Sequence, residues 1–165
     1  MDRMKKWILL GVLALFALVI WAGMDLVLDI MKDREQGLAE ARKVAQQMTG
    51  WKIVAETRFH GQAPYFIFTM QDQHGELYYL VVDEQNRGQY FPFKELAWDE
   101  EKVREQVKRE YGEWHIKAIR PAFVYPEMCW EVVLVDSEET WHYIYYSMKN
   151  GQFIKRFTLS DSLRS

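Results

Sequence analysis

The sequence predicts an α+β protein in which an N-terminal transmembrane helix precedes two tandem modules, each a helix packed on an antiparallel β-meander. Three observations carry this prediction: an uncharged apolar run near the N-terminus, two series of helix-like and strand-like segments, and sequence matches between the two series at a nearly constant offset. With 165 residues, 49% hydrophobic and 15% aromatic, the chain has the composition of a folded protein. The expected organisation is a cytoplasmic N-terminus (1–6), a transmembrane signal anchor (7–28), a first module (29–94), a second module (95–160) and a tail (161–165).

The first element is a membrane anchor. Residues 7–24 carry no charge, and at about 1.5 Å per residue this run with its flanks spans the ~30 Å hydrocarbon core of a bilayer. Basic residues precede the run at Arg3, Lys5 and Lys6, which places the N-terminus in the cytoplasm and the modules outside the cell. A cleaved signal peptide is the alternative, but the run is longer than the apolar core of such peptides and lacks a small-residue cleavage site.

Each module begins with an amphipathic helix. Apolar residues recur at helical spacing between Asp29 and Met48, and Gly50 ends this stretch. The second helix begins after Asp99, a good N-cap, and ends at Gly112. Strand-like runs follow each helix, at 51–59, 65–71, 76–82 and 88–93 in the first series and at 114–124, 128–135, 140–148 and 152–159 in the second.

The two series are copies of one module. At an offset of 63 or 64 residues, Trp51 aligns with Trp114 and Asp72 aligns with Asp136. Further matches in the same register are Phe66 with Trp130, Tyr79 with Tyr143, and Gly88-Gln89-Tyr90 with Gly151-Gln152-Phe153. The order of elements repeats as well, so a tandem duplication is predicted. Units of this size bury only ~60% of their surface, and we therefore expect the copies to pack on each other.

No residue pattern in the chain predicts a reaction, a metal site or a cofactor. The histidines are scattered, with no second His or Cys at ligand spacing, and they stand at His60, His74, His115 and His142. The single cysteine, Cys129, is interpreted as a buried apolar residue rather than a nucleophile. Residues 1–24 carry a net charge of +2, so the rest of this −3 chain carries −5, which disfavours nucleic acid as a partner.

Aromatic residues are concentrated on the strands and are the candidates for contact with a partner. In the strand 141–146, alternation places Trp141, Tyr143 and Tyr145 on one face and leaves apolar residues on the other face as well. Since one helix covers one face of a small sheet, the other face must meet the sister module, the membrane surface or another protein. The candidate partner-binding residues are Tyr79, Trp130, Trp141, Tyr143, Tyr145 and Tyr146.

The chain resembles the YpmB/TseB family of extracytoplasmic proteins from rod-shaped Gram-positive bacteria. The resemblance rests on the N-terminal anchor, the Trp51-Lys52-Ile53-Val54 segment, the strand 77–83 and the Gly151-Gln152-Phe153 strand. It implies cystatin-like modules close to the PepSY group. It also implies a non-enzymatic role in regulating cell-wall elongation through a class B penicillin-binding transpeptidase or another cell-wall synthesis protein in the membrane.

A competing function is protease inhibition or ligand sensing by a cystatin-like domain. Cystatins inhibit through a Gln-x-Val-x-Gly hairpin, and the segment 71–75 keeps that spacing with Gln71 and Gly75. Gln73 stands where the apolar valine belongs, and the corresponding segment of the second copy keeps neither end of the motif. The sequence therefore favours the regulatory interpretation.

Overall fold

The computed structural model describes residues 37–60 and 64–159. The predicted cytoplasmic N-terminus, the anchor and the tail lie outside these ranges, and so does the start of the first predicted helix. Among the described helices, none is both long and apolar enough to cross a bilayer. Residues 41–165 form one compact unit, which holds both sheets. The boundary between the modules at residues 94 and 95 stays a prediction.

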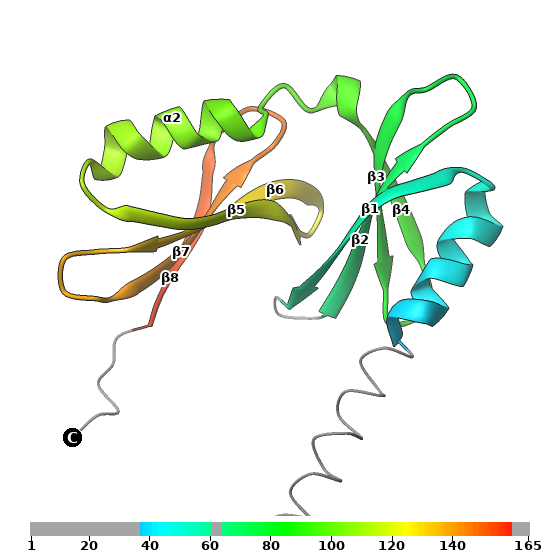
Figure 1. The fold of residues 1–165 in the computed structure, drawn as a ribbon, viewed down its shortest axis with the longest axis horizontal. Helices are drawn as coiled ribbons and strands as arrows, with labels where there is room; N and C mark the ends of the chain where they lie inside the picture. Colours follow the sequence, from blue (N-terminus) through cyan, green and yellow to red (C-terminus); the bar gives the residue numbers. More distant parts are fainter. Residues whose placement is uncertain (1–36, 61–63, 160–165) are drawn as a thin grey trace, which may run out of the picture. The chain divides into compact units, whose positions relative to one another are not determined.

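The first sheet has four antiparallel strands in sequential order, preceded by a helix over residues 37–49 (Figure 1). Its strands are β1 (Lys52–His60), β2 (Pro64–Gln71), β3 (Leu77–Asp83) and β4 (Gly88–Pro92). The helix turns small side chains toward the sheet, since Ala41 and Ala45 are buried, and Arg42 forms an ion pair with Glu56 of β1 at 2.7 Å. A short 3-10 turn, η1 (Phe93–Glu95), follows β4.

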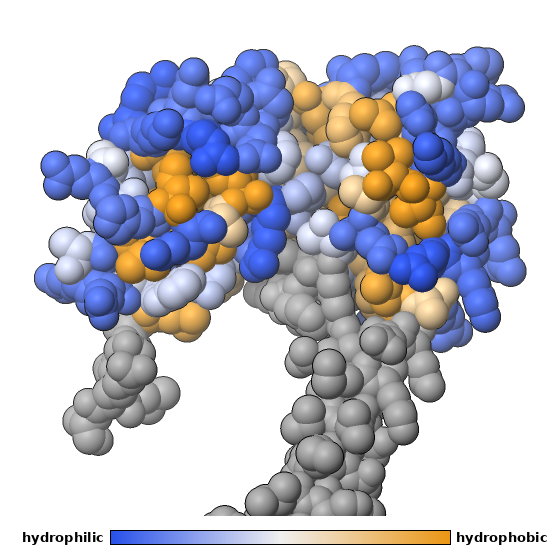
Figure 2. All heavy atoms as spheres, in the orientation of Figure 1, coloured by the Kyte–Doolittle hydropathy of each residue, from blue (hydrophilic) through white to orange (hydrophobic). Residues whose placement is uncertain are grey.

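The second sheet repeats this arrangement. Helix α2 (Glu100–Tyr111) precedes four antiparallel strands in sequential order, β5 (His115–Val124), β6 (Glu127–Val135), β7 (Trp141–Ser147) and β8 (Phe153–Leu159). The Asp99 side chain caps α2 by accepting a hydrogen bond of 2.9 Å from the Lys102 amide. Val103 and Val107 are fully buried, whereas the outer surface of α2 is hydrophilic (Figure 2). The predicted helix and its cap are therefore confirmed.

The two sheets share local details that point to a duplicated module. Asp72 Oδ1 accepts hydrogen bonds from the amides two and four residues later, and Asp136 Oδ1 does the same in the second sheet. A register shift interrupts β1 between Ile53 and Ala55, and an equivalent shift interrupts β5 between Ile116 and Ala118. These features lie 63 or 64 residues apart, so the structure is consistent with tandem modules at the predicted offset.

The core of the second sheet continues into the first. One cluster of buried residues joins Val103, Val107 and Ile144 of the second module with Ile67 and Val81 of the first. The Phe123 ring of β5 lies 5.1 Å from the ring of Tyr65 and 5.7 Å from that of Phe91. The expected packing between the copies is thus present. Within the second module, the Trp98 amide donates to the Met148 carbonyl and the Trp130 indole donates to the Trp98 carbonyl, so the segment before α2 is fixed to the second sheet.

Gly151 provides a sharp test of the packing of Trp98 on the second sheet. Its φ is +73°, and a Cβ atom there would lie 2.1 Å from the Trp98 ring. We expect Gly151→Ala to lower the free energy of unfolding by about 2–5 kcal/mol, because backbone strain and a steric clash add. Gly50→Ala is the matched control, since Gly50 has φ +65° with no atom near the added methyl group, and only about 1–2 kcal/mol is expected. Urea unfolding measures both variants, and equal losses would contradict the packing of Trp98 on Gly151.

Candidate functional site

The six aromatic candidates separate into four that are buried and two that reach the surface. Tyr79, Trp130, Tyr145 and Tyr146 are all less than 10% exposed, whereas Trp141 is 43% exposed and Tyr143 is half-buried. The four buried side chains belong to the core and offer little surface to another molecule. Contact with a partner through these six residues stays a prediction, and Trp141 and Tyr143 are its accessible members.

The buried hydroxyl groups are explained by their partners. Tyr146 donates to a carboxylate oxygen of Glu110 on α2 at 2.5 Å, which identifies the β7 face that α2 covers. Burial and this hydrogen bond raise the pKa of Tyr146 far above its usual value. Burial also raises the pKa of Tyr79 to about 12, so neither phenol ionises near neutral pH.

The face of the second sheet away from α2, here called the open face, carries exposed apolar side chains. Strand alternation places Trp141, Tyr143 and Tyr145 on this face of β7. Cross-strand pairing adds Leu159 opposite Trp141 and Phe157 opposite Tyr143, both on β8. Leu159 is 60% exposed and Phe157 is 46% exposed, so they form an accessible apolar surface with Trp141.

A row of polar groups crosses the open face beside this apolar surface. Its members face one another across the four strands and are Arg120, Glu131, Tyr145 and Lys155. Glu131 is only 2% exposed, and both of its oxygens are bonded. Oε1 accepts from the Arg120 guanidinium at 2.6 Å and Oε2 accepts from the Tyr145 hydroxyl at 2.6 Å. Arg120 and Tyr145 stabilise the Glu131 carboxylate in this row, because a buried carboxylate requires such partners.

The first sheet has no charge in the corresponding row. Its members are Thr57, Ile67, Val81 and Gln89, which pair across the strands in the same order. Ile67 is as buried as Glu131, at 2% exposure. The neighbouring rows are similar in the two sheets, with Ala55, Thr69, Tyr79 and Phe91 in one and Ala118, Val133, Tyr143 and Phe157 in the other. The charged row therefore distinguishes the second module from the first.

Sequence reasoning missed several residues of the open face. Phe157 and Leu159 alternate along the last predicted strand, and the repeat aligns Ile67 with Glu131, so both signals were present in the sequence. The pairing of Arg120 with Glu131 also needed the register of β5 and β6, which the bulge near Ile116 displaces by one residue.

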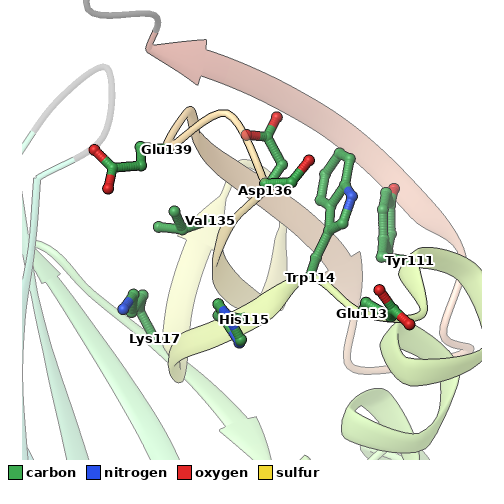
Figure 3. A pocket seen from close by; sticks show the side chains of 9 residues that line it. Tyr111, Glu113, Trp114, His115, Lys117, Val135, Asp136 and Glu139 are labelled. Carbon is green, nitrogen blue, oxygen red and sulfur yellow. The ribbon is translucent and has the colours of Figure 1, made fainter.

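A pocket of about 780 Å³ lies at the end of the second sheet where β6 turns into β7. Its lining comes from the end of α2, the start of β5 and the turn, and Tyr111 lies beside Trp114 (Figure 3). The ring of His142 stacks on the Trp114 indole, with 4.4 Å between the ring centres. The lining residues are Tyr111, Glu113, Trp114, His115, Lys117, Val135, Asp136, Ser137 and Glu139.

His142 joins three elements through its two ring nitrogens. Nε2 lies 2.8 Å from Asp136 Oδ2, and Nδ1 lies 3.1 Å from Thr158 Oγ1. A hydroxyl, an imidazole and a carboxylate in sequence have the order of a catalytic triad. Asp136, however, also accepts two amides of the turn through Oδ1, and His142 is 6% exposed beneath Trp114. These contacts fasten β7 to the turn and to β8, and we interpret them as structural.

Neither Cys129 nor a metal centre offers chemistry among the described residues. Cys129 is buried, and burial raises the pKa of its thiol to about 12, so it stays protonated near neutral pH. Within residues 37–60 and 64–159, no group of three His, Cys, Asp or Glu side chains is placed to hold a metal ion. The 71–75 hairpin is an ordinary turn capped by Asp72 and adds no observation in favour of an inhibitor.

Comparison with known proteins shows the class of fold. No family model and no curated protein sequence matches the chain. Among solved structures, the YpmB protein from Bacillus subtilis matches with a TM-score of 0.62 and 23% identity, over 76% of this chain and 96% of that chain. A BLIP-like protein from Bacteroides fragilis matches with a TM-score of 0.40 and 12% identity, over 72% and 84%.

The protein is thus an α+β chain of two helix-and-sheet modules. Its fold is the YpmB fold, which confirms the predicted resemblance at the level of structure.

The interaction of Asp136 with His142 predicts a pH dependence of stability. The hydrogen bond from His142 is the largest cause that lowers the pKa of Asp136 below its usual value. A lowered folded-state pKa gives stability that is complete above about pH 4 and is lost as the pH falls through the folded pKa. We expect Asp136→Asn to flatten the fall in thermal midpoint between about pH 5 and pH 3.

Asp72→Asn is the matched control, because it alters the same turn cap in the first sheet, where the capping carboxylate accepts backbone amides and, among the described residues, no bond from a histidine ring. This variant should keep the fall seen in the unmodified chain. An unchanged acid dependence in Asp136→Asn would show that the contact with His142 contributes no pH-dependent stability.

Proposed function

We propose that the chain is a non-enzymatic, membrane-anchored regulator that binds another protein outside the cell through the open face of the second sheet. The single observation that carries the proposal is the exposed apolar surface made by Trp141, Phe157 and Leu159 on that face. Tryptophan and tyrosine are enriched among the residues that contribute most of the binding energy at protein interfaces. The buried Cys129 and the structural contacts of His142 favour binding over catalysis.

The rigidity of the open face also supports a binding role. Tyr145 is fixed by its bond to Glu131, and its ring lies 6.0 Å from the Phe157 ring in an edge-to-face contact. On the same face, Val133 pairs with Tyr143 and Val135 pairs with Trp141, and both valines are less than 10% exposed. Side chains that are already held in place lose little conformational entropy when a partner binds.

We propose a penicillin-binding transpeptidase of cell-wall elongation as the partner. The sequence resemblance to the YpmB/TseB family and the likeness of the fold to YpmB support this choice. A membrane-bound partner also agrees with the anchor predicted at residues 7–28. Such an anchor would hold both modules near the extracellular face of the cell membrane.

The binding proposal predicts the effect of truncating the open face. We expect Trp141→Ala and Phe157→Ala each to weaken binding of the full-length chain to the extracytoplasmic part of a class B penicillin-binding protein by about tenfold or more. Biolayer interferometry with the chain in nanodiscs gives the dissociation constants. Tyr125→Ala is the control, because Tyr125 is 79% exposed and lies outside the open face. Equal affinities for all three variants and the unmodified chain would refute the role of this surface.

The predicted orientation can be tested separately. A reporter that is active only in the cytoplasm, fused after Ser165, should give no signal, whereas the same reporter fused before Met1 should be active. Mass spectrometry of the purified chain should find residues 1–28 retained. Strong activity of the C-terminal fusion, or a mature chain that begins near Gly23, would contradict a retained anchor with external modules.

A further inference from the structure

Lys155 is a cation that the fold holds on the open face with no carboxylate partner among the described residues. Its Nζ atom lies 5.1 Å from the centre of the Tyr145 ring and 5.0 Å from that of the Phe157 ring. Contacts of this kind keep an ammonium group over aromatic faces. Among the residues that the structure describes, no carboxylate forms an ion pair with Lys155.

The nearby acid is already bonded to two other side chains and forms no ion pair with Lys155. Glu131 accepts from Arg120 through Oε1 and from Tyr145 through Oε2. Lys155 is itself half-buried, so water reaches it less freely than it reaches an ordinary surface lysine. An incoming carboxylate would meet a partly desolvated cation, where a charged hydrogen bond is stronger than it is on an open surface.

Comparison of the two sheets indicates that the charge on this row has a role other than folding. The first sheet builds the same row with Ile67 and Val81 in place of Glu131 and Tyr145, and with Gln89 in place of Lys155. Ile67 and Glu131 are equally buried, although Ile67 lies in the core shared with the other module, so burial alone does not require a charge in this row. A buried ion pair is seldom more stabilising than apolar side chains of similar size. The charged row of the second sheet is therefore suited to recognition.

We propose that Lys155 receives a carboxylate of the partner protein, from a segment in which an acidic residue stands next to apolar side chains that cover Trp141 and Phe157. This inference rests on the proposed function, since it names the chemistry of what the open face binds. We infer the acidic residue of the partner segment from charge complementarity with Lys155. We infer its apolar neighbours from the exposed rings beside Lys155.

A protein segment fits this surface better than an anionic membrane does. Recognition of acidic lipids requires clusters of several basic residues, whereas on this row Arg120 is already paired with Glu131 and Lys155 stands alone. Residues 25–165 carry a net charge of −5, which opposes attraction to an anionic bilayer.

Selection from a display library of random peptides tests the inference without reference to any transpeptidase. The full-length chain in nanodiscs of zwitterionic lipid is the bait. The unmodified chain should enrich peptides in which Asp or Glu adjoins aromatic or aliphatic residues. Lys155→Met should lose the acidic preference and keep the apolar one, and Lys155→Glu should enrich Lys or Arg instead.

Lys149→Glu is the matched control, since Lys149 lies in the exposed β7–β8 turn and outside the open face, and its selected peptides should equal those of the unmodified chain. Thermal unfolding midpoints verify that each variant is folded. The proposal would be overturned if Lys155→Glu selected the same sequences as the unmodified chain. It would also be overturned if the unmodified chain enriched no peptides.

Hydrogen exchange tests the alternative in which Lys155 binds an anionic lipid. Protection of β8 that appears with phosphatidylglycerol nanodiscs alone, and is lost in Lys155→Glu, would assign Lys155 to lipid and overturn the proposal. Failure to bind a transpeptidase together with acidic peptide selection would instead refute only the proposed partner.

Discussion

The structure depends on one geometric constraint: a single helix can cover only one face of a four-stranded sheet. Each module has one such helix, so each sheet has a second apolar face to cover. In the first sheet, Ile67 and Val81 on that face are buried in the core that it shares with the second module. In the second sheet, Trp141 and Leu159 on that face stay exposed. The same constraint thus gives packing in one copy and an accessible surface in the other.

The elements that follow from local chemistry could be predicted from the sequence. Asp99 and Gly112 mark the ends of α2, and Asp72 and Asp136 mark the turns, because capping and turn formation involve residues only a few positions apart. Strand alternation also separated Trp141 from His142 correctly. Local patterns therefore defined the strands and the repeat within one or two residues.

The sequence could not predict which side chains of each sheet face are covered and which are exposed. That depends on contacts between residues far apart in the chain. Alternation grouped Tyr145 with Trp141, but Tyr145 is buried and bonded to Glu131, whereas Trp141 is exposed. The partner of Tyr146 is Glu110, which lies 36 residues earlier on α2. Aromatic content alone therefore selected candidates that include core residues, whereas the exposed apolar surface emerged from the pairing of β7 with β8.

Because the two modules share one fold, equivalent positions in their sheets can be compared directly. Both copies keep the turn aspartate, the bulge in the first strand and the row that contains Tyr79 or Tyr143, which are the features that the fold requires. The row with Ile67 in one copy and Glu131 in the other differs, although both positions are equally buried. Because an apolar pair satisfies that position in the first sheet, packing does not demand a carboxylate there, and its desolvation opposes folding. The charge is best explained by its position, since Arg120 and Tyr145 hold Glu131 in the centre of the face and leave Lys155 as the cation beside the exposed rings. On such a surface the exposed rings supply most of the binding energy. The ammonium group of Lys155, which has no ion-pair partner among the described residues, discriminates among partners.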